Sequence, residues 1–387
     1  MSEWKKVRLG DVVSIKSGLS YKSEFIGKGD NLLLGMGCVS YKEQFLDSGV
    51  RPYSQDCDLK YMAAPGDLVL ATRQQSDNLP ILAMPAIIPE KYRGRKIIIG
   101  TNLYRVENQS DIDNRFLFFV LKGLDYVNYI RGVKTGTTVQ MVSKRNVEEY
   151  CFLCPPKETR EQIVSILSRY DTLIENYQRQ IKLLEEAAQR LYKEWFVDLR
   201  FPGYENTKIV DGVPEGWGPS KLGDLAEFRR GKTITKKEII EGSVPVVAGG
   251  ITPAYYCNKS NTENRVITIS ASGKAGFVKM YFEKIWASDC SFLDVSDTTF
   301  LHFIFCYLKQ NQISIYNMQK GSAQQHVYAK DINAMDLLRP TEELLNCFEK
   351  IISKDFDKIS ALQSQIRLLT EARDRFLPKL MSGEITV

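Results

Sequence analysis

The stretch that decides the fold runs from residue 159 to residue 197 and reads TREQIVSILSRYDTLIENYQRQIKLLEEAAQRLYKEWFV. Its apolar and aromatic residues fall on two interleaved seven-residue series, which is the alternating spacing of a coiled-coil seam. A continuous helix over this stretch would be about 58 Å long, and one with so narrow an apolar stripe needs a partner helix. The two series are Ile163, Tyr170, Tyr177, Leu184 and Leu191, and Leu167, Ile174, Ile181, Ala188 and Trp195.

The partner lies in the same chain, because the pattern returns 185 residues later. Single identities repeat as well: Ile181 corresponds to Ile366 and Glu186 to Glu371. The pattern breaks near Asp355, where Phe356 lies one position off the stripe. We therefore expect two long helices that pair in antiparallel fashion. The second set of stripe residues is Phe348, Leu362, Leu369 and Phe376, and Ile352, Ile359, Ile366 and Leu380.

The two halves of the chain also begin and end alike. The start around Trp4, the sequence LGD at 9–11 and Gly18 recurs 213 residues later. Toward the end of each half the offset is 185, where GTTVQMVSKRNV at 136–147 aligns with GSAQQHVYAKDI at 321–332. The first half therefore has 28 additional residues, which we place between Gly18 and about Asp111.

These repeats predict an α+β fold with a pseudo-twofold internal repeat. Two strand-rich α/β domains are joined by a pair of long antiparallel coiled-coil helices. The Gly- and Pro-rich sequence FPGYENTKIVDGVPEGWG has the composition of a linker. The predicted parts are a first domain at 1–157, a helix at 158–200, a linker at 201–218, a second domain at 219–341 and a second helix at 342–387.

Within each domain the sequence predicts strands followed by helices. Two long apolar stretches read as helices that begin after the capping aspartates Asp113 and Asp297. Strands are expected where β-branched and aromatic residues gather. The expected strands cover residues 65–72, 95–106, 265–270 and 276–282.

Composition narrows the class of protein. The chain has 387 residues, 43% of them hydrophobic, and a net charge of +5, which permits a nucleic-acid partner without requiring one. Neither a signal peptide nor a membrane span is expected, so we predict a cytoplasmic protein with reduced thiols. Cys151 and Cys154 form a C-x-x-C. Because the chain has only two histidines, buried structural cysteines are favoured there over a metal site.

The sequence shows no constellation of catalytic residues. It has no phosphate-cradling G-x-x-x-x-G-K-[ST], and its one Pro-Pro pair, at 155–156, lacks the acidic and aromatic neighbours of a methyltransferase motif. No pair of strand-borne carboxylates with a nearby lysine suggests a nuclease. We expect neither an enzyme nor a metal site.

The domains instead carry polar loops at equivalent places. Gln, Arg and Lys can bond to base edges, while Ser, Thr and backbone amides can bind phosphate. A single loop of this kind is more often merely solvated, and its recurrence in both halves favours a DNA-binding role. The first loop supplies Lys134, Thr135, Thr137, Thr138, Gln140, Lys144 and Arg145, and the second Lys320, Ser322, Gln324, Gln325, His326 and Lys330.

Two further loops follow strands directly, where a strand-built domain presents an edge. They are candidates for the same role, with a polar strand end as the equally weighted alternative. The candidate DNA-binding residues of these loops are Arg73, Gln74 and Gln75, and Ser270, Ser272 and Lys274.

The features above resemble the DNA specificity subunit of a Type I restriction-modification system. The resemblance covers essentially the whole chain. It is carried by LYKEWFVDLRFPG at 191–203, LPKLMSGEI at 377–385 and the LGD sequences at 9–11 and 222–224. The resemblance implies a non-catalytic protein in which two target recognition domains each read one half of a bipartite double-stranded DNA sequence, with the coiled coil fixing the spacer.

The resemblance also implies partners. Two modification subunits, which hold S-adenosylmethionine, would bind around the helices, and restriction subunits that use ATP and Mg²⁺ would join them, while this chain holds no cofactor itself. The expected docking face on the first helix carries Glu185, Glu186, Arg190 and Lys193. Two alternatives stay open: the partner is a fused nuclease-methyltransferase, or the chain is a coiled-coil scaffold without sequence readout.

Overall fold

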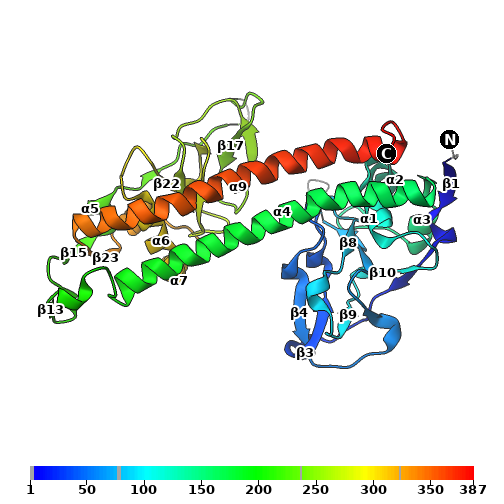
Figure 1. Ribbon diagram of the computed structural model, residues 1–387, viewed down its shortest axis with the longest axis horizontal. Helices are drawn as coiled ribbons and strands as arrows, with labels where there is room; N and C mark the ends of the chain where they lie inside the picture. Colours follow the sequence, from blue (N-terminus) through cyan, green and yellow to red (C-terminus); the bar gives the residue numbers. More distant parts are fainter. Residues whose placement is uncertain (1–3, 76–79, 236–237, 322–323) are drawn as a thin grey trace. The chain divides into compact units, whose positions relative to one another are not determined.

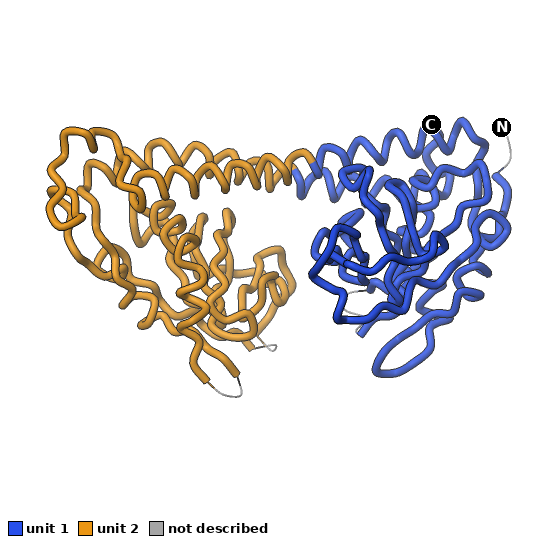
Figure 2. The backbone as a smooth tube through the Cα atoms, turned by 90° about the horizontal axis from the view of Figure 1, so that it is seen from below, with its two compact units in different colours: residues 1–175, 366–387 blue, residues 176–365 orange. Residues whose placement is uncertain are grey.

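The computed structural model describes residues 4–75, 80–235, 238–321 and 324–387. The chain divides into two compact units (Figure 2). Unit 1 is Met1–Glu175 with Ile366–Val387, and unit 2 is Asn176–Gln365. Two long helices, α4 (Lys157–Tyr192) and α9 (Glu342–Ser382), each contribute residues to both units.

Each unit is closed by a short antiparallel strand pair that joins its start to its exit. In unit 1, β1 (Lys5–Arg8) pairs with β12 (Cys151–Cys154), and in unit 2, β15 (Gly218–Lys221) pairs with β23 (Asp336–Arg339). The amide of the LGD leucine donates to an exit carbonyl in both units. These bonds are Leu9 N to Tyr150 O at 2.7 Å and Leu222 N to Met335 O at 2.9 Å. The entrance and exit similarities in the sequence therefore meet in space.

Two sheets form the body of each unit, and their topologies match. The larger sheet has the order β2-β10-β6-β8 in unit 1 and β16-β22-β19-β20 in unit 2. The second sheet is four-stranded, β4-β3-β9-β5, in unit 1 and three-stranded, β18-β17-β21, in unit 2.

The strand bounds show how short most of these elements are. In unit 1 they are β2 (Val13–Ser17), β3 (Ile26–Leu34), β4 (Val50–Tyr53), β5 (Met62–Ala63), β6 (Leu68–Ala71), β8 (Pro85–Ile87), β9 (Ile97–Ile99) and β10 (Leu103–Asn108). In unit 2 they are β16 (Arg229–Arg230), β17 (Val244–Val247), β18 (Tyr255–Cys257), β19 (Val266–Ser270), β20 (Val278–Tyr281), β21 (Trp286–Ala287) and β22 (Cys290–Asp294).

Matching hydrogen bonds locate the additional residues of unit 1. Leu34 O accepts from Gly100 N after β9, and Val247 O accepts from Ser288 N after β21. Leu34 and Val247 are therefore equivalent, and the two units are still 213 residues apart in numbering at this point. Gly18 N donates to Leu103 O, and the equivalent Gly231 N donates to Cys290 O. Leu103 and Cys290 are therefore equivalent, and the difference in numbering has fallen to 187. All but two of the additional residues therefore lie between Leu34 and Leu103, inside the predicted interval. This segment includes β5, which has no counterpart among the described strands of unit 2.

The expected helices form, with two corrections. Asp113 caps α1 (Asn114–Lys122) as predicted, its carboxylate accepting from Arg115 N at 2.6 Å, and Gly123 then separates α1 from α2 (Leu124–Val133). Asp297 does not cap α6 (Leu301–Gln310), because its carboxylate accepts from Asp294 N and from Arg229. A separate helix, α7 (Gln312–Asn317), follows α6.

The expected strand at 95–106 is also divided. It forms β9 and β10, because the chain turns at Gly100, whose missing side chain allows close approach to Leu34 O. The other three expected strands are found as β6, β19 and β20.

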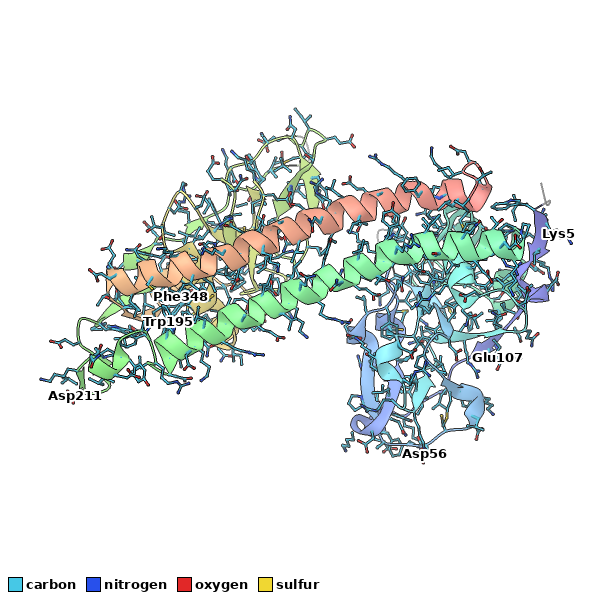
Figure 3. The ribbon with its side chains drawn as sticks, in the orientation of Figure 1. Lys5, Asp56, Glu107, Trp195, Asp211 and Phe348 are labelled. Atoms are coloured by element: carbon cyan, nitrogen blue, oxygen red, sulfur yellow. The ribbon has the colours of Figure 1, made fainter. Side chains whose placement is uncertain are left out.

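Within each unit α4 and α9 run side by side (Figure 1). Residues of their two apolar stripes pack together. In unit 2, Trp195, in the π-helical turn η7 (Lys193–Val197), packs on Phe348 with ring centroids 5.7 Å apart (Figure 3). In unit 1, the ring centroids of Tyr170 and Phe376 are 6.2 Å apart, and Phe376 remains 39% exposed. Because low-numbered residues of α4 meet high-numbered residues of α9, and the reverse, the pairing is antiparallel.

The break in the α9 stripe marks a second apolar face. Phe356 is 1% exposed and stacks on His302 of α6 with ring centroids 4.6 Å apart. Seven residues earlier on α9, Glu349 accepts from Phe303 N at 2.8 Å and so satisfies an amide in the first turn of α6. In unit 2, α9 therefore packs on α4 with one face and on α6 with another.

Unit 1 uses a buried ion pair between the same two helices. Asp171 of α4 and Arg373 of α9 are 2.7 Å apart, with side chains 5% and 14% exposed. Gln44 donates to the second oxygen of Asp171 at 2.5 Å. The Lys122 ammonium, at the end of α1, donates to the carbonyls of Ser40 and Tyr41, so the loop carrying Gln44 is itself tied down.

The structure also bears on three further predictions, which concern the C-x-x-C cysteines, the linker and the absence of a membrane span. Cys154 is buried as expected, but Cys151 is exposed because alternate residues of β12 point to opposite faces. The linker-like stretch 201–218 contains the hairpin β13 (Ile209–Val210) and β14 (Val213–Pro214) and is bounded by the buried Phe201 and Trp217. No helix in the described part of the chain is long and apolar enough to cross a membrane.

Replacing Asp171 with alanine should destabilise unit 1 by roughly 3–5 kcal/mol, because Arg373 then stays buried without its principal partner. Urea unfolding followed by near-ultraviolet circular dichroism measures the effect. Glu161→Ala, which removes an exposed pair with Lys157, is the control and should change the free energy of unfolding by less than about 0.5 kcal/mol. Equal effects of the two substitutions would show that the buried pair does not hold the helices together.

Candidate functional site

Unit 1 brings two of its predicted loops together. The strand β7 (Arg73–Gln74), which follows β6, pairs in antiparallel register with β11 (Gln140–Met141) of the Gly-led loop. That loop is a closed hairpin, in which Thr135 and Met141 exchange backbone hydrogen bonds of 2.9 and 2.8 Å. Gly136 takes a φ of +89°, and an added Cβ would lie 2.2 Å from Val139 O. The hairpin therefore requires glycine there.

Unit 2 builds the same hairpin at an offset of 185. Lys320 and His326 exchange backbone hydrogen bonds of 2.9 and 2.8 Å, and Gly321 has a φ of +115°. Val327 N then donates to Ala271 O at 3.1 Å, which places the hairpin beside the loop that follows β19. The same two loop types therefore converge in both units.

Most predicted hairpin side chains are exposed. Thr135, Thr137 and Thr138 lie on the surface of unit 1, and Lys320, Gln324 and Gln325 lie on the surface of unit 2. His326 is half-buried, and its ring stacks on Tyr328 at 6.0 Å. The Lys320 ammonium binds Asp331 at 2.8 Å. Ser322 lies outside the described residues.

Three predicted contact residues have internal roles instead. Gln74 is 3% exposed, and its side-chain oxygen accepts from Ile81 N and Leu82 N. Ser270 and Ser272 are also buried, and their hydroxyls donate to Gly250 O and to the Asp289 carboxylate. These side chains hold the loops in place.

Three of the remaining loop residues lie at the two strand ends. Gln75 and Lys274 are exposed, and Arg73 is half-buried, with its Nε lacking a hydrogen-bond partner within the part of the chain that the structure describes. Tyr104 of β10 fixes the exit of the first hairpin by donating to Val142 O at 2.9 Å. Burial raises the pKa of Tyr104, and the positive charge of Arg73 opposes that rise.

Three of the four remaining basic candidates follow the hairpins on short helices. Lys144 and Arg145 belong to α3 (Lys144–Glu148), and Lys330 belongs to the equivalent α8 (Ala329–Asn333). Arg145 is paired with Glu149 at 2.7 Å, and the Lys330 ammonium lies 5.9 Å from the Tyr328 ring centroid. Half-buried Lys134 precedes the first hairpin.

The predicted docking residues lie along the C-terminal half of α4 and in η7. Glu185, Arg190 and Lys193 are exposed, and Glu186 is half-buried. Arg190 lies 3.6 Å from Glu186 along the helix, while Lys193 binds Asp198 at 2.6 Å. Charge-paired residues of this kind are compatible with solvent or with a protein partner.

The described residues contain no cluster of three or more His, Cys, Asp or Glu side chains that could hold a metal ion. What both units present is a glycine-hinged hairpin with polar side chains, which include Thr and Gln in unit 1 and Lys and Gln in unit 2, supported by a strand-end loop. That arrangement offers hydrogen-bond donors and acceptors on a rigid frame, and it suits recognition of a polar surface.

A sequence model of the Type I restriction modification DNA specificity domain matches residues 1–186 and 214–368. The chain belongs to this family. The two matched regions include both hairpins, and the resemblance found in the sequence is confirmed. The specificity family is the DNA-recognition component of its systems and is non-catalytic.

Named relatives of the specificity family extend over the full chain. The Type I restriction enzyme MjaIX specificity subunit of Methanocaldococcus jannaschii is 22% identical over 420 residues, covering 100% of this chain and 94% of that protein. The Type I restriction enzyme HindI specificity subunit of Haemophilus influenzae is 22% identical over 474 residues, covering 100% of both.

The α+β fold is also confirmed by a solved structure. The Type-I restriction-modification system S subunit from M. genitalium covers 98% of this chain and 96% of its own, with a TM-score of 0.57 and 17% sequence identity. At this level of identity the likeness shows a shared fold.

Sequence reasoning did not find the pairing of β7 with β11 or the support given by Tyr104. β7 and β11 are two residues long each, too short for any periodicity. Tyr104 belongs to a stretch that reads simply as a strand. A signal was available for the hairpin itself, because Gly136 and Gly321 align at the repeat offset and glycine is preferred at positive φ.

Gly136→Ala should open the first hairpin, because alanine at positive φ costs about 1–3 kcal/mol and its Cβ would contact the Val139 carbonyl. Hydrogen exchange at the Thr135 and Met141 amides should accelerate about tenfold or more. Gly132→Ala is the matched control, because an added Cβ on this helix meets open space. Exchange rates that stay unchanged in Gly136→Ala would contradict a closed hairpin.

Proposed function

We propose that this chain is the sequence-reading subunit of a Type I restriction-modification complex and binds double-stranded DNA in the cytoplasm. Each unit reads one half of a bipartite target with its hairpin and adjoining strand-end loop. The observation that carries the proposal is the recurrence of the same hydrogen-bonded hairpin in both halves of a chain that belongs to the DNA specificity family. A scaffold would have no need to preserve two such hairpins with different polar side chains.

The half-sites should differ from one another. The hairpin residues that follow the glycine are Thr137, Thr138 and Gln140 in unit 1, whereas Gln324 and Gln325 stand in unit 2. The additional strand β5 and its flanking segments belong to unit 1 alone among the described residues. Two readers with different side chains imply an asymmetric target, because direct readout depends on which donors and acceptors each presents.

The long helices supply the spacer in this proposal. Both α4 and α9 are continuous, and residues of each belong to both units. A stiff helical connection keeps the effective concentration of the second reader high once the first has bound. A fixed number of nonspecific base pairs between the half-sites follows from such a connection.

The catalytic partners complete the proposal. Two modification subunits carrying S-adenosylmethionine would dock on the helices, with Glu185, Glu186, Arg190 and Lys193 as the candidate face, and restriction subunits using ATP and Mg²⁺ would join them. The exposed charges on the second half of α4 support this placement. DNA binding itself needs only this chain's hairpins and loops.

Gln140→Ala should weaken discrimination in one half-site and Gln325→Ala in the other, each by about 1–3 kcal/mol per lost base contact. Duplexes with base changes confined to one half-site, titrated against the assembled complex, measure this. Gln180→Ala, which alters a helix side chain away from both hairpins, is the control and should change neither. Identical discrimination in all three variants would count against the hairpins as readers.

Salt distinguishes a reader from a scaffold. Contacts to about six phosphates would lower duplex affinity about a thousandfold between about 50 and 200 mM salt, through counterion release. The preferred sequence should be retained while affinity falls. An affinity for duplex that barely responds to salt, together with normal partner assembly, would favour the scaffold.

A further inference from the structure

The base of the first hairpin carries a guanidinium without a protein partner. Arg73 of β7 lies opposite Met141 of β11 in the strand register, and its side chain is half-buried. Its Nε is buried without a hydrogen-bond partner, and no ion pair joins Arg73 to another residue that the structure describes. Arginine has five N–H donors and no acceptor. These groups are therefore satisfied only by water or by acceptors that a ligand brings.

The surroundings of Arg73 place its charge beside the exit of the hairpin. Burial raises the pKa of Tyr104, and the positive charge of Arg73 opposes that rise. The Tyr104 hydroxyl donates to Val142 O at 2.9 Å, immediately after β11. The guanidinium thus lies near the point where the chain leaves the hairpin. The strand pairing and the half-buried stem of Arg73 restrict the directions in which its donors can point.

The equivalent place in unit 2 can be identified from matching backbone hydrogen bonds. Thr72 N donates to Asn102 O at 3.0 Å, and Ala271 N donates to Asp289 O at 3.1 Å. Thr72 and Ala271 both come directly after a central strand, β6 or β19. They are therefore equivalent, as are Asn102 and Asp289. The residue that follows Thr72 corresponds to the residue that follows Ala271.

Unit 2 satisfies its polar groups internally at this place, and unit 1 does not. The residue equivalent to Arg73 is Ser272, which is 8% exposed and donates its hydroxyl to the carboxylate of Asp289. In unit 1 the carboxylate is replaced by the neutral amide of Asn102. The two side chains together carry one negative charge in unit 2 and one positive charge in unit 1. Only unit 1 therefore keeps an uncompensated cation beside its hairpin at this place.

We propose that Arg73 reads a guanine in the half-site of unit 1. This inference rests on the proposed function of the first hairpin. The guanine edge presents two acceptors in the major groove, O6 and N7, which match the paired donors of a guanidinium. A phosphate also accepts from arginine, but a flexible lysine would serve a phosphate equally well. An arginine held by a strand pair and a half-buried stem suits the directional contact to a base. Unit 2 reads no base from the equivalent Ser272.

Two substitutions of Arg73 test the guanine contact in the full-length chain, expressed with its modification subunit. Arg73→Met keeps an unbranched stem and loses every donor. Arg73→Gln offers an amide that matches adenine N6 and N7. In the methylated motif of cellular DNA, both variants should lower the preference for guanine at one position by about tenfold or more, and Arg73→Gln should favour adenine there.

A change in the DNA identifies the atom that Arg73 contacts. In 7-deazaguanine a carbon replaces the N7 acceptor, so a duplex carrying it at that position lacks one hydrogen bond to the guanidinium. The wild-type complex should bind this duplex about tenfold more weakly than the guanine duplex. Arg73→Met should bind the two duplexes equally well.

Two further variants locate the effect. Arg93→Gln removes another arginine of unit 1, one that is already paired with Glu90, and it should leave the motif unchanged. Gln325→Ala alters the hairpin of unit 2. The half-site that Gln325→Ala changes should be the one that the Arg73 variants leave intact.

The outcomes separate the guanine contact from the proposed function. A wild-type chain that yields no sequence-specific motif would overturn the proposed function itself. A normal wild-type motif that stays unchanged in both Arg73 variants would overturn only the guanine contact. An equal loss of affinity for all duplexes, with a salt dependence reduced by about one phosphate, would do the same, because it indicates a phosphate contact. Faster amide exchange at Thr135 in both variants would show that Arg73 holds the hairpin, which also overturns its role as a reader.

Discussion

The structure depends on covering the narrow apolar stripe of two very long helices. A single helix of 36 residues such as α4 would be only marginally stable alone, because its apolar stripe would be exposed to water along its whole length. The antiparallel partner α9 supplies the cover, through the buried Asp171–Arg373 pair and Tyr170 in unit 1 and through Trp195 and Phe348 in unit 2. As a result each unit combines the start of one helix with the end of the other.

The same closure is then used twice with different contents. In both units a short strand pair joins entrance to exit, and a glycine-hinged hairpin stands beside the loop after the central strand. Between these shared features the chain varies in length and in polar residues. A reader of two unlike half-sites requires a constant framework with variable loops. The loop side chains determine specificity, and the sheets and helices hold those side chains in place.

Much of the fold could be predicted because it is repetitive. Three features recur at fixed offsets: the heptads of α4, the LGD starts and the hairpin glycines. A pattern that occurs twice at a fixed offset rarely arises by chance. What could not be predicted are contacts made across long sequence separations. Asp171 reads as a solvated helix residue until Arg373 and Gln44 surround it, and Phe356 reads as a fault in the stripe until His302 covers it. Asp297 resembled a cap, but the first turn of α6 is satisfied by Glu349 from another helix.

The candidate site was predicted less completely, for a related reason. Loop composition indicated where polar residues gather, but it could not separate side chains that face outward from those that hold the loop. Gln74 and Gln75 are neighbours of the same type, yet one is 3% exposed and the other is exposed. Gln74 belongs to the two-residue strand β7 and Gln75 follows it, and only the pairing with β11 reveals that strand.

The central claim is the proposal that one chain joins two different readers of a bipartite target whose spacer has a constant length. The most direct test is to map methylated bases in the genome of cells that carry this chain together with its modification subunit. The expected result is one asymmetric motif in two parts, with a constant number of unspecified base pairs between them. A palindromic motif, a continuous motif or a variable gap would contradict the claim.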